Sequence, residues 1–336
     1  QQKINKYRMM ESSVEEFSFS GCHSFNLVPV NVAVSYLYFF LFPISLLLNV
    51  IAAWVSFHLR STSTFIVYLK NLVASDLLMT LTLPTIAAGM LPEATVELDV
   101  FSCRFSSVIY YNCLYTSITL MGLISLDRFF KIVRPWNLTF SKVLSGSVWV
   151  ILFGSVALPN MILSNQVANV TDSCMQLKGP AGLEFHHNIV IYVNVFFWLV
   201  SGVIMVCYIC ITNKVLQSFK NSGSNNDQGK QKIKLRVFLV VIVFFLSFGP
   251  YHIIRFPYTF HQVNNSSYTS CSYLKKKMAK EVSLWFATTN TCMNPLLYIF
   301  LCREFKEKLM SMVENVCTPF KGAAEKAEED LPQSRL

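Results

Sequence analysis

One apolar segment, SFGPYHIIRFPYTF at residues 247–260, carries an imidazole and a guanidinium among aromatic and aliphatic side chains. His252, Arg255 and then Tyr258 or Thr259 are spaced three to four residues apart, so on a helix they share one face. A guanidinium within an apolar helix is costly and marks a functional site by default. Because arginine binds phosphate through two parallel hydrogen bonds, this face is suited to an anion.

Other cations and tyrosines are predicted to lie at the same end of the molecule. Lys275, Lys276, Lys277 and Lys280 stand at the start of an apolar run, and Lys178 follows Cys174 by four residues. Tyr111 and Tyr115 are one helical turn apart on a further run. Lysine adds a point charge and a tyrosine ring can stack on a base, so we expect an anionic ligand with an aromatic ring. The expected contacts are His252, Arg255, Tyr258, Lys280, Tyr111, Tyr115 and Lys178.

Two simpler interpretations of these cations stay open. Long basic side chains can extend along apolar surface to reach lipid headgroups. Lys280 can also pair with its neighbour Glu281 and have no part in ligand binding.

The elements that position these residues are apolar runs. The 336 residues are 53% hydrophobic and 14% charged, against about 25% charged in soluble proteins. About 20 apolar residues cross a bilayer as a helix, and seven such runs are present, near 30–57, 65–91, 101–132, 142–163, 188–211, 235–260 and 281–301. The sequence therefore predicts an all-α membrane protein, a seven-transmembrane helix bundle with a short amphipathic eighth helix.

The chain divides around this bundle. We expect an extracellular tail at 1–29, the bundle at 30–301, an amphipathic helix on the inner leaflet at 302–316 and a cytoplasmic tail at 317–336. With the N-terminus outside, 18 of the 28 basic residues lie on the inner side, which satisfies the positive-inside rule. The net charge of +9 is thus a topology signal and does not indicate nucleic-acid binding. We predict a multi-pass protein of the plasma membrane that contacts lipids, with an uncleaved first helix as its signal anchor.

Cysteines and glycosylation motifs agree with this orientation. Cys22, Cys103, Cys174 and Cys271 fall outside, where disulfides persist, and allow three pairings. We favour Cys103 with Cys174 and Cys22 with Cys271. Glycosylation acceptors are expected on the same side, at Asn169, Asn264 and Asn265, and Cys317 on the inner side is a candidate for palmitoylation.

Polar side chains recur at mid-membrane depth. Asp76 lies within NLVASDLLMTL, and Asn49, Ser117, Asn290 and Asn294 lie at comparable depth on other runs. Their oxygens could coordinate a sodium ion, with Asp76 supplying the charge. The alternative is a protonated aspartate hydrogen-bonded to these neighbours. We predict no other metal and no cofactor.

The inner half carries residues typical of a conformational switch. Asp127 and Arg128 lie at the inner end of the third run, where acid and base can neutralise each other until the arginine finds a new partner. Prolines weaken helices because they remove a backbone hydrogen bond. Pro250 and Pro295 mark expected hinges for this reason. The residues of the predicted switch are Asp127, Arg128, Phe248, Pro250, Pro295 and Tyr298.

With these residues in place, the chain resembles the rhodopsin class of G-protein-coupled receptors over about residues 30–315. The resemblance rests on Asn49, Asp76, Cys103, Asp127-Arg128, Trp149, Pro250, Asn290, Asn294-Pro295 and Tyr298. The segments PYHIIRFPYT, AKEVSLW, CRFSSVIYY, FIVYLKN and LKGPAGL look like the purinergic family, in the branch that senses ADP and UDP-sugars. Phe129 departs from the tyrosine usual after Asp-Arg, and Val190 stands where ADP-sensing members can offer asparagine.

The resemblance implies a receptor for an extracellular nucleotide, most readily ADP, that signals through Gi-type heterotrimeric G proteins. UDP-sugar and lysophospholipid receptors of the same fold are the alternatives. A transporter would show repeated halves, and an opsin would carry a lysine where Thr288 stands, so both are disfavoured. No nucleophile elbow, HExxH run or glycine-rich phosphate loop is present, so we predict no enzyme and no catalytic residues.

Overall fold

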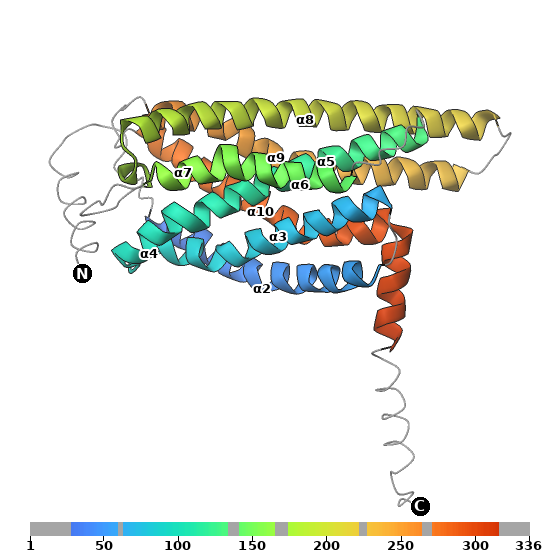
Figure 1. The fold of residues 1–336 in the computed structure, drawn as a ribbon, viewed down its shortest axis with the longest axis horizontal. Helices are drawn as coiled ribbons and strands as arrows, with labels where there is room; N and C mark the ends of the chain where they lie inside the picture. The colour runs from blue at the N-terminus through green and yellow to red at the C-terminus, as the bar shows by residue number, and fades with distance from the viewer. Residues whose placement is uncertain are drawn as a thin grey trace, which may run out of the picture.

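The computed structural model describes residues 28–59, 63–133, 141–164, 174–221, 227–263 and 271–315, and its regular structure in these ranges is helical. Seven long helical segments run side by side (Figure 1). They are α2 (Val28–His58), α3 (Thr64–Gly89), α4–η1–α5 (Val96–Phe101, Ser102–Ser106, Ser107–Ile132), α6–η2–α7 (Ser141–Leu152, Phe153–Ala157, Leu158–Ile162), α8 (Pro180–Asn221), α9 (Asp227–Val263) and α10 (Cys271–Leu301). The predicted seven-helix bundle is confirmed. A further helix over 303–315 crosses one end of it.

The helices close into a ring. Around it α2 packs on α3, α3 on α5, α5 on α8, α8 on α9, α9 on α10, and α10 returns to α2. Helix α6 lies outside this ring, against α3 and α5. Residues of α5, α8, α9 and α10 can therefore meet around one central space.

The distribution of side chains is that of a bundle surrounded by lipid. Large apolar side chains such as Phe40, Phe57 and Val150 are exposed, whereas Asn49 and Asp76 are fully buried. By length and composition, six of the described helical segments can cross a membrane. Helix α10 is not among them, since polar residues, including Asn290 and Asn294, line its buried face.

Three helices extend beyond the ranges expected from hydropathy. Helix α8 begins at Pro180 and not near residue 188, α9 begins at Asp227 and not near 235, and α10 begins at Cys271 and not near 281. Hydropathy detects the part of a helix that lies in hydrocarbon. Backbone hydrogen bonding continues into the polar turns on either side, where composition gives no signal.

Candidate ligand-binding site

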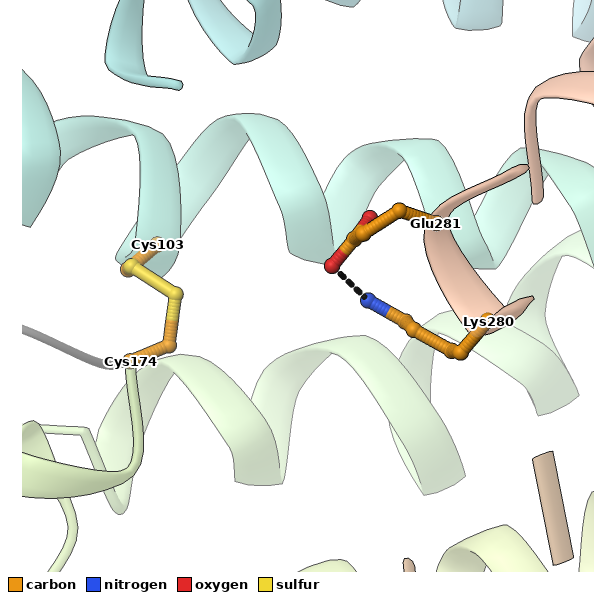
Figure 2. Close-up of a disulfide and its surroundings, with 4 residues drawn as sticks. All are labelled: Cys103, Cys174, Lys280 and Glu281. Atoms are coloured by element: carbon orange, nitrogen blue, oxygen red, sulfur yellow. Dashed lines mark hydrogen bonds and ion pairs between the residues drawn. A yellow bond between two sulfur atoms is a disulfide. The ribbon is translucent and has the colours of Figure 1, made fainter. Parts of the chain in front are cut away.

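A disulfide ties the segment before α8 to the end of the third spanning segment. Cys103 in η1 and Cys174 at the start of η3 (Cys174–Leu177) are bonded, with their Cα atoms 5.3 Å apart (Figure 2). This confirms the first of the two pairings favoured from the sequence. The bridge fixes the chain four residues before Lys178, which keeps that lysine beside the end of the bundle.

Other predicted modifications fall outside the described residues and stay predictions. This holds for glycosylation at Asn169, Asn264 and Asn265, for palmitoylation at Cys317, and for the bridge of Cys22 with the side chain of Cys271.

Arg255 points into the bundle from α9. Only 7% of its surface is exposed, and its guanidinium carbon lies 5.6 Å from the centre of the Tyr111 ring on α5. One guanidinium nitrogen is 3.5 Å from Nε2 of His186 on α8. No described carboxylate lies within ion-pair distance of this guanidinium. Arg255 is therefore a buried cation held by an aromatic face and an imidazole, and it does not extend to the lipid.

Lys280 enters the same end of the bundle from α10. Its ammonium donates to Oε1 of Glu281 at 2.8 Å (Figure 2). It also lies 5.8 Å from the centre of the Tyr258 ring on α9. Tyr258 in turn stacks on Tyr273, with ring centres 5.6 Å apart. The pair with Glu281 is thus made, as the simpler interpretation expected, but both side chains are largely buried and Lys280 faces Tyr258.

His252 lies one turn deeper than Arg255 on α9. Its Nδ1 is 2.8 Å from the carbonyl oxygen of Phe248, and a carbonyl only accepts, so Nδ1 carries the proton. The ring stacks on Phe197 at 3.7 Å and meets the edge of Tyr115 at 5.8 Å. Nε2 of His252 is buried and has no partner among the described atoms, so an acceptor is left free beside the tyrosines.

Lys178 lies between η3 and α8. Its ammonium donates to Oδ1 of Asn160 on α7 at 2.6 Å, and the residue is 9% exposed. Burial, and secondarily the charge of Arg255, lower the pKa of Lys178 to about 8. An anion bound beside it would favour the protonated form and raise that pKa again.

The predicted contacts therefore converge from several elements. The Tyr111 ring on α5 contacts two residues of α9. The guanidinium of Arg255 lies over it, and the ring of Tyr251 stacks on it with the ring centres 6.4 Å apart. The ring of Tyr251 meets that of His252 at 5.1 Å. Cations and tyrosines from α5, α9, α10 and the segment after η3 thus surround one region, which can hold an anion against aromatic faces.

Sequence reasoning missed several members of this region, among them Tyr251, His186 and Asn160. His186 on α8 approaches Arg255 but was not among the contacts predicted from the sequence. Asn160 accepts a hydrogen bond from the Lys178 ammonium. Nothing in the sequence indicated this role, because Asn160 lies near the end of an ordinary apolar run. His186 precedes the apolar run expected near 188–211, but α8 begins at Pro180, so His186 lies on the helix and is buried.

The polar residues at mid-membrane depth also meet. Asp76 is fully buried, and its Oδ2 accepts from Nδ2 of Asn294 at 2.8 Å while its Oδ1 accepts from Oγ of Ser117 at 3.1 Å. Oδ1 of Asn290 and Oδ1 of Asn49 are buried without described partners. One carboxylate with hydroxyl and amide oxygens around it is a donor set that fits a sodium ion.

The inner switch residues are arranged differently from the expected acid–base neighbours. Asp127 is 1% exposed and accepts from Nζ of Lys131 at 2.8 Å and from the hydroxyl of Thr64 on α3. Arg128 lies over the Phe65 ring, 4.4 Å from its centre. The side chain of Asp127 is turned toward α3, so its partners come from there and from one turn along its own helix.

Two further switch residues lie in the packed interior. Phe248 is fully buried one turn before His252, and Pro250 follows it within α9. Tyr298, one turn after Asn294 on α10, has a buried hydroxyl without a described partner. Its ring meets the edge of Phe305 at 5.7 Å, which connects α10 to helix 303–315.

Seven helical segments, six of them closed into a ring, together with a fully buried carboxylate and a disulfide-bridged segment at one end, define a seven-helix membrane receptor. Residues 28–298 match the family described as 7 transmembrane receptor (rhodopsin family). The chain belongs to this family, as its motifs predicted. Since members of the family are receptors, the prediction that the chain is not an enzyme is also confirmed.

The similar proteins include purinoceptors. The chain is 44% identical to human purinoceptor 13 over 285 residues, 82% of this chain and 80% of that protein. It is 39% identical to bovine purinoceptor 14 over 86% of this chain and 87% of that protein, and 37% identical to mouse G-protein coupled receptor 87 over 81% and 78%. The predicted resemblance to the purinergic branch is confirmed, and CRFSSVI and LKGP, which favour purinoceptor 13 within it, agree with the match to the human protein.

Proposed function

We propose that this chain is a plasma-membrane receptor with its N-terminus outside, which binds an extracellular nucleoside diphosphate and signals through a heterotrimeric G protein. ADP is the proposed ligand and a Gi-type protein the proposed transducer. The similarity to purinoceptors 13 and 14 supports the nucleotide class. The excess of lysine and arginine on the inner side supports the orientation.

The observation that carries the proposal is the state of Arg255. It is a buried guanidinium with an aromatic face beside it and no described carboxylate as counter-ion. A buried charge without a counter-ion is costly, so binding an anion beside it recovers free energy. Phosphate matches the planar fork of arginine with two parallel hydrogen bonds.

The remaining contacts can be assigned by chemistry. Lys280 and Lys178 would add point charges for the second phosphate group, and Tyr258 would donate to phosphate oxygens. Tyr111 and Tyr115 offer ring faces for a base, and Nε2 of His252 is a free acceptor for a ribose hydroxyl or an exocyclic amine. The polyanion would thus lie toward Lys280 and the base deeper, toward His252.

Signalling would follow from drawing two helices together. A diphosphate that contacts Arg255 and Lys280 favours a closer approach of the outer ends of α9 and α10. Pro250 and Phe248 lie between this region and the inner half of α9, so closure outside can move the inner end and free Arg128 for a G protein. Switching a 1:99 equilibrium to 99:1 takes about 5.5 kcal/mol. Charge-assisted hydrogen bonds contribute about 1.5–3 kcal/mol each, so two to four suffice.

We also propose that a sodium ion binds beside Asp76 and favours the resting state. Asn290, Ser117 and Asn294 would complete its oxygen ligands, and Oδ1 of Asn290 is free for that role. The ion would supply a positive charge at the centre of the bundle, where Asp76 is otherwise met only by hydrogen-bond donors.

The test is a dose-response series in cells expressing the chain, with suppression of cAMP as the readout. ADP should act at the lowest concentration, and Arg255→Ala should shift its curve by about tenfold or more while surface expression is retained. Arg104→Ala is the matched control, because Arg104 is also an outer arginine but lies over Phe105, 5.5 Å from that ring centre. An unchanged curve for Arg255→Ala would remove Arg255 from the site.

The same series separates the alternatives. A response to UDP-glucose with none to ADP would identify a UDP-sugar receptor. The observation that favours this alternative is the buried Val190, which stands where ADP-sensing members can offer asparagine. A response to a lysophospholipid alone would replace the nucleotide proposal, since that ligand also needs cations beside apolar walls.

A further inference from the structure

A groove on the lipid-facing side of the bundle lies between α3, α5 and the α6–η2 segment. Its volume is about 460 Å³, within the range of about 300–1,000 Å³ typical of small-molecule sites. Its lining includes Leu78, Ile109, Asn112, Trp149, Val150 and Phe153. Leu78, Val150 and Phe153 are exposed on the outside of the bundle, so the groove is reached from the hydrocarbon of the membrane.

Asn112 gives this apolar groove an unused polar group. The residue is 5% exposed, and its Oδ1 is buried without a hydrogen-bond partner among the described atoms. The other strong polar group of the lining, the indole N–H of Trp149, already donates to Oδ1 of Asn71 at 3.1 Å. An acceptor left unpaired within a bilayer costs free energy, so a donor arriving there is favoured.

The depth of Asn112 restricts what can supply that donor. Oγ of Ser75 donates to the carbonyl of Cys113 at 2.9 Å, which places Asn112 level with the middle of α3. The hydrocarbon core is about 30 Å thick, so this position is about 15 Å from either surface. Headgroup donors of phospholipids stay at the surface, and their acyl chains carry no donor. Bilayer phospholipids therefore supply no donor at this depth, whereas a hydroxyl-bearing molecule dissolved in the hydrocarbon does.

The wall of the groove contains a helix irregularity. The π-helical segment η2 begins at Phe153 and ends at Ala157, and both of these residues line the groove. Single π-turns within α-helices are rare and occur frequently at functional sites. Asn112 also follows Tyr111 directly along α5, so the groove and the candidate nucleotide site lie on different faces of one helix.

We propose that this groove binds a lipophilic alcohol. Its hydroxyl donates to Oδ1 of Asn112, and its hydrocarbon body packs along Trp149 and Phe153 and remains in contact with the lipid. The site is separate from the nucleotide site and does not depend on the ligand proposed there. A second copy of this chain, a bare acyl chain and a buried water are the competing occupants.

The probe is a diazirine-bearing octanol, photolysed with the full-length receptor in phosphatidylcholine nanodiscs, with adducts mapped by mass spectrometry. We expect adducts on groove residues, competed by 1-octanol. Asn112→Leu removes the acceptor at similar size and should weaken that competition about tenfold, the loss expected for one hydrogen bond. Ala157→Phe fills the groove and should abolish the adducts, while Asn188→Leu, an exposed asparagine on α8, is the matched control and should label as wild type.

Three results would overturn the proposal. Equal labelling by a diazirine-bearing octane, which lacks the hydroxyl, would identify an acyl-chain groove. If 1-octanol competes with labelling of Asn112→Leu as well as it does with the wild type, Oδ1 of Asn112 does not bind the alcohol, and a buried water is its partner. Cross-links between two receptor chains in place of octanol adducts would identify a self-association surface. If Asn112→Leu does not fold, judged by thermal melting, the octane comparison and Ala157→Phe still decide between these outcomes.

Discussion

The ammonium of Lys280 lies 2.8 Å from the carboxylate of Glu281, its neighbour along α10. Lys280 thus already has a counter-ion, whereas Arg255 has none among the described residues. A phosphate that approaches Lys280 must displace Glu281 or share the lysine with it. Glu281 is therefore expected to weaken the binding of an anion and to disfavour ligands of low negative charge.

Glu281→Gln should raise the potency of ADP about two- to fivefold. The change removes the competing charge but keeps the size of the side chain. The expected gain is small because the desolvation of a largely buried ion pair offsets most of its Coulomb energy. The measurement is the ADP dose-response curve at matched surface expression, with Glu281→Asp as the control that keeps the charge. A loss of potency in the glutamine variant would mean that Glu281 contacts the ligand directly.

Nucleotide binding should weaken as the pH is raised through 8. The pKa of Lys178 is lowered to about 8 in the free protein, so at higher pH binding of an anion must be accompanied by uptake of a proton. If the anion restores an ordinary lysine pKa, affinity falls about tenfold between pH 7 and pH 9. Lys178→Arg keeps the charge at all these pH values, so its affinity should change much less over that range in the same membranes.

The stability of the unliganded protein should change with pH in the opposite direction to the nucleotide affinity. Between about pH 8 and the ordinary lysine pKa, the unfolded chain holds a proton on Lys178 that the folded protein has lost, so the free energy of unfolding of the unliganded protein rises with pH there. Thermal melting without ligand at pH 7.5 and pH 9 measures this, and Lys178→Arg should show no such gain. Equal pH dependence in the two proteins would contradict the assignment to Lys178.

Sodium should reduce ADP affinity through Asp76. If the ion favours the resting state, replacing N-methylglucamine chloride by NaCl at constant ionic strength should lower affinity about fivefold, the lower range of typical couplings between sites. Asp76→Asn removes the charge that holds the cation and should abolish the difference. Ser117→Ala removes one oxygen and should reduce it. Equal ADP affinity of the wild-type protein in the two salts would contradict a sodium site at Asp76.

Cys174→Ser should lower both stability and affinity. The bridge to Cys103 closes a loop with a sequence separation of 71, and losing a native disulfide typically costs about 2–5 kcal/mol. Lys178, four residues later, would lose its fixed place, so ADP affinity should fall as well. Thermal melting and ligand binding on the same preparation measure the two effects, with Cys210→Ser, an unbridged cysteine on α8, as control. Unchanged affinity despite a lower melting temperature would show that the bridge does not position Lys178 for the ligand.

The outline of this protein could be predicted from sequence because a bilayer imposes simple requirements. Each span must be apolar and helical, so the runs that became α2 to α10 were visible, and costly residues such as Asp76 and Arg255 stood out against them. The spacing of His252, Arg255 and Tyr258 placed them on one face without knowledge of any neighbour. A polar extension such as the first turns of α8 gave no comparable signal, which hid His186.

Partnerships between helices were decided only by tertiary structure. Adjacent charges in the chain suggested that Asp127 would pair with Arg128, but consecutive residues of a helix point about 100° apart. The packing of α3 against α5 instead brings Thr64 to Asp127 and Phe65 to Arg128. In the same way, composition showed that Lys178 was basic, and only the fold showed it buried against Asn160 with a lowered pKa. Sequence determines which groups are costly in a membrane; packing determines which group relieves that cost.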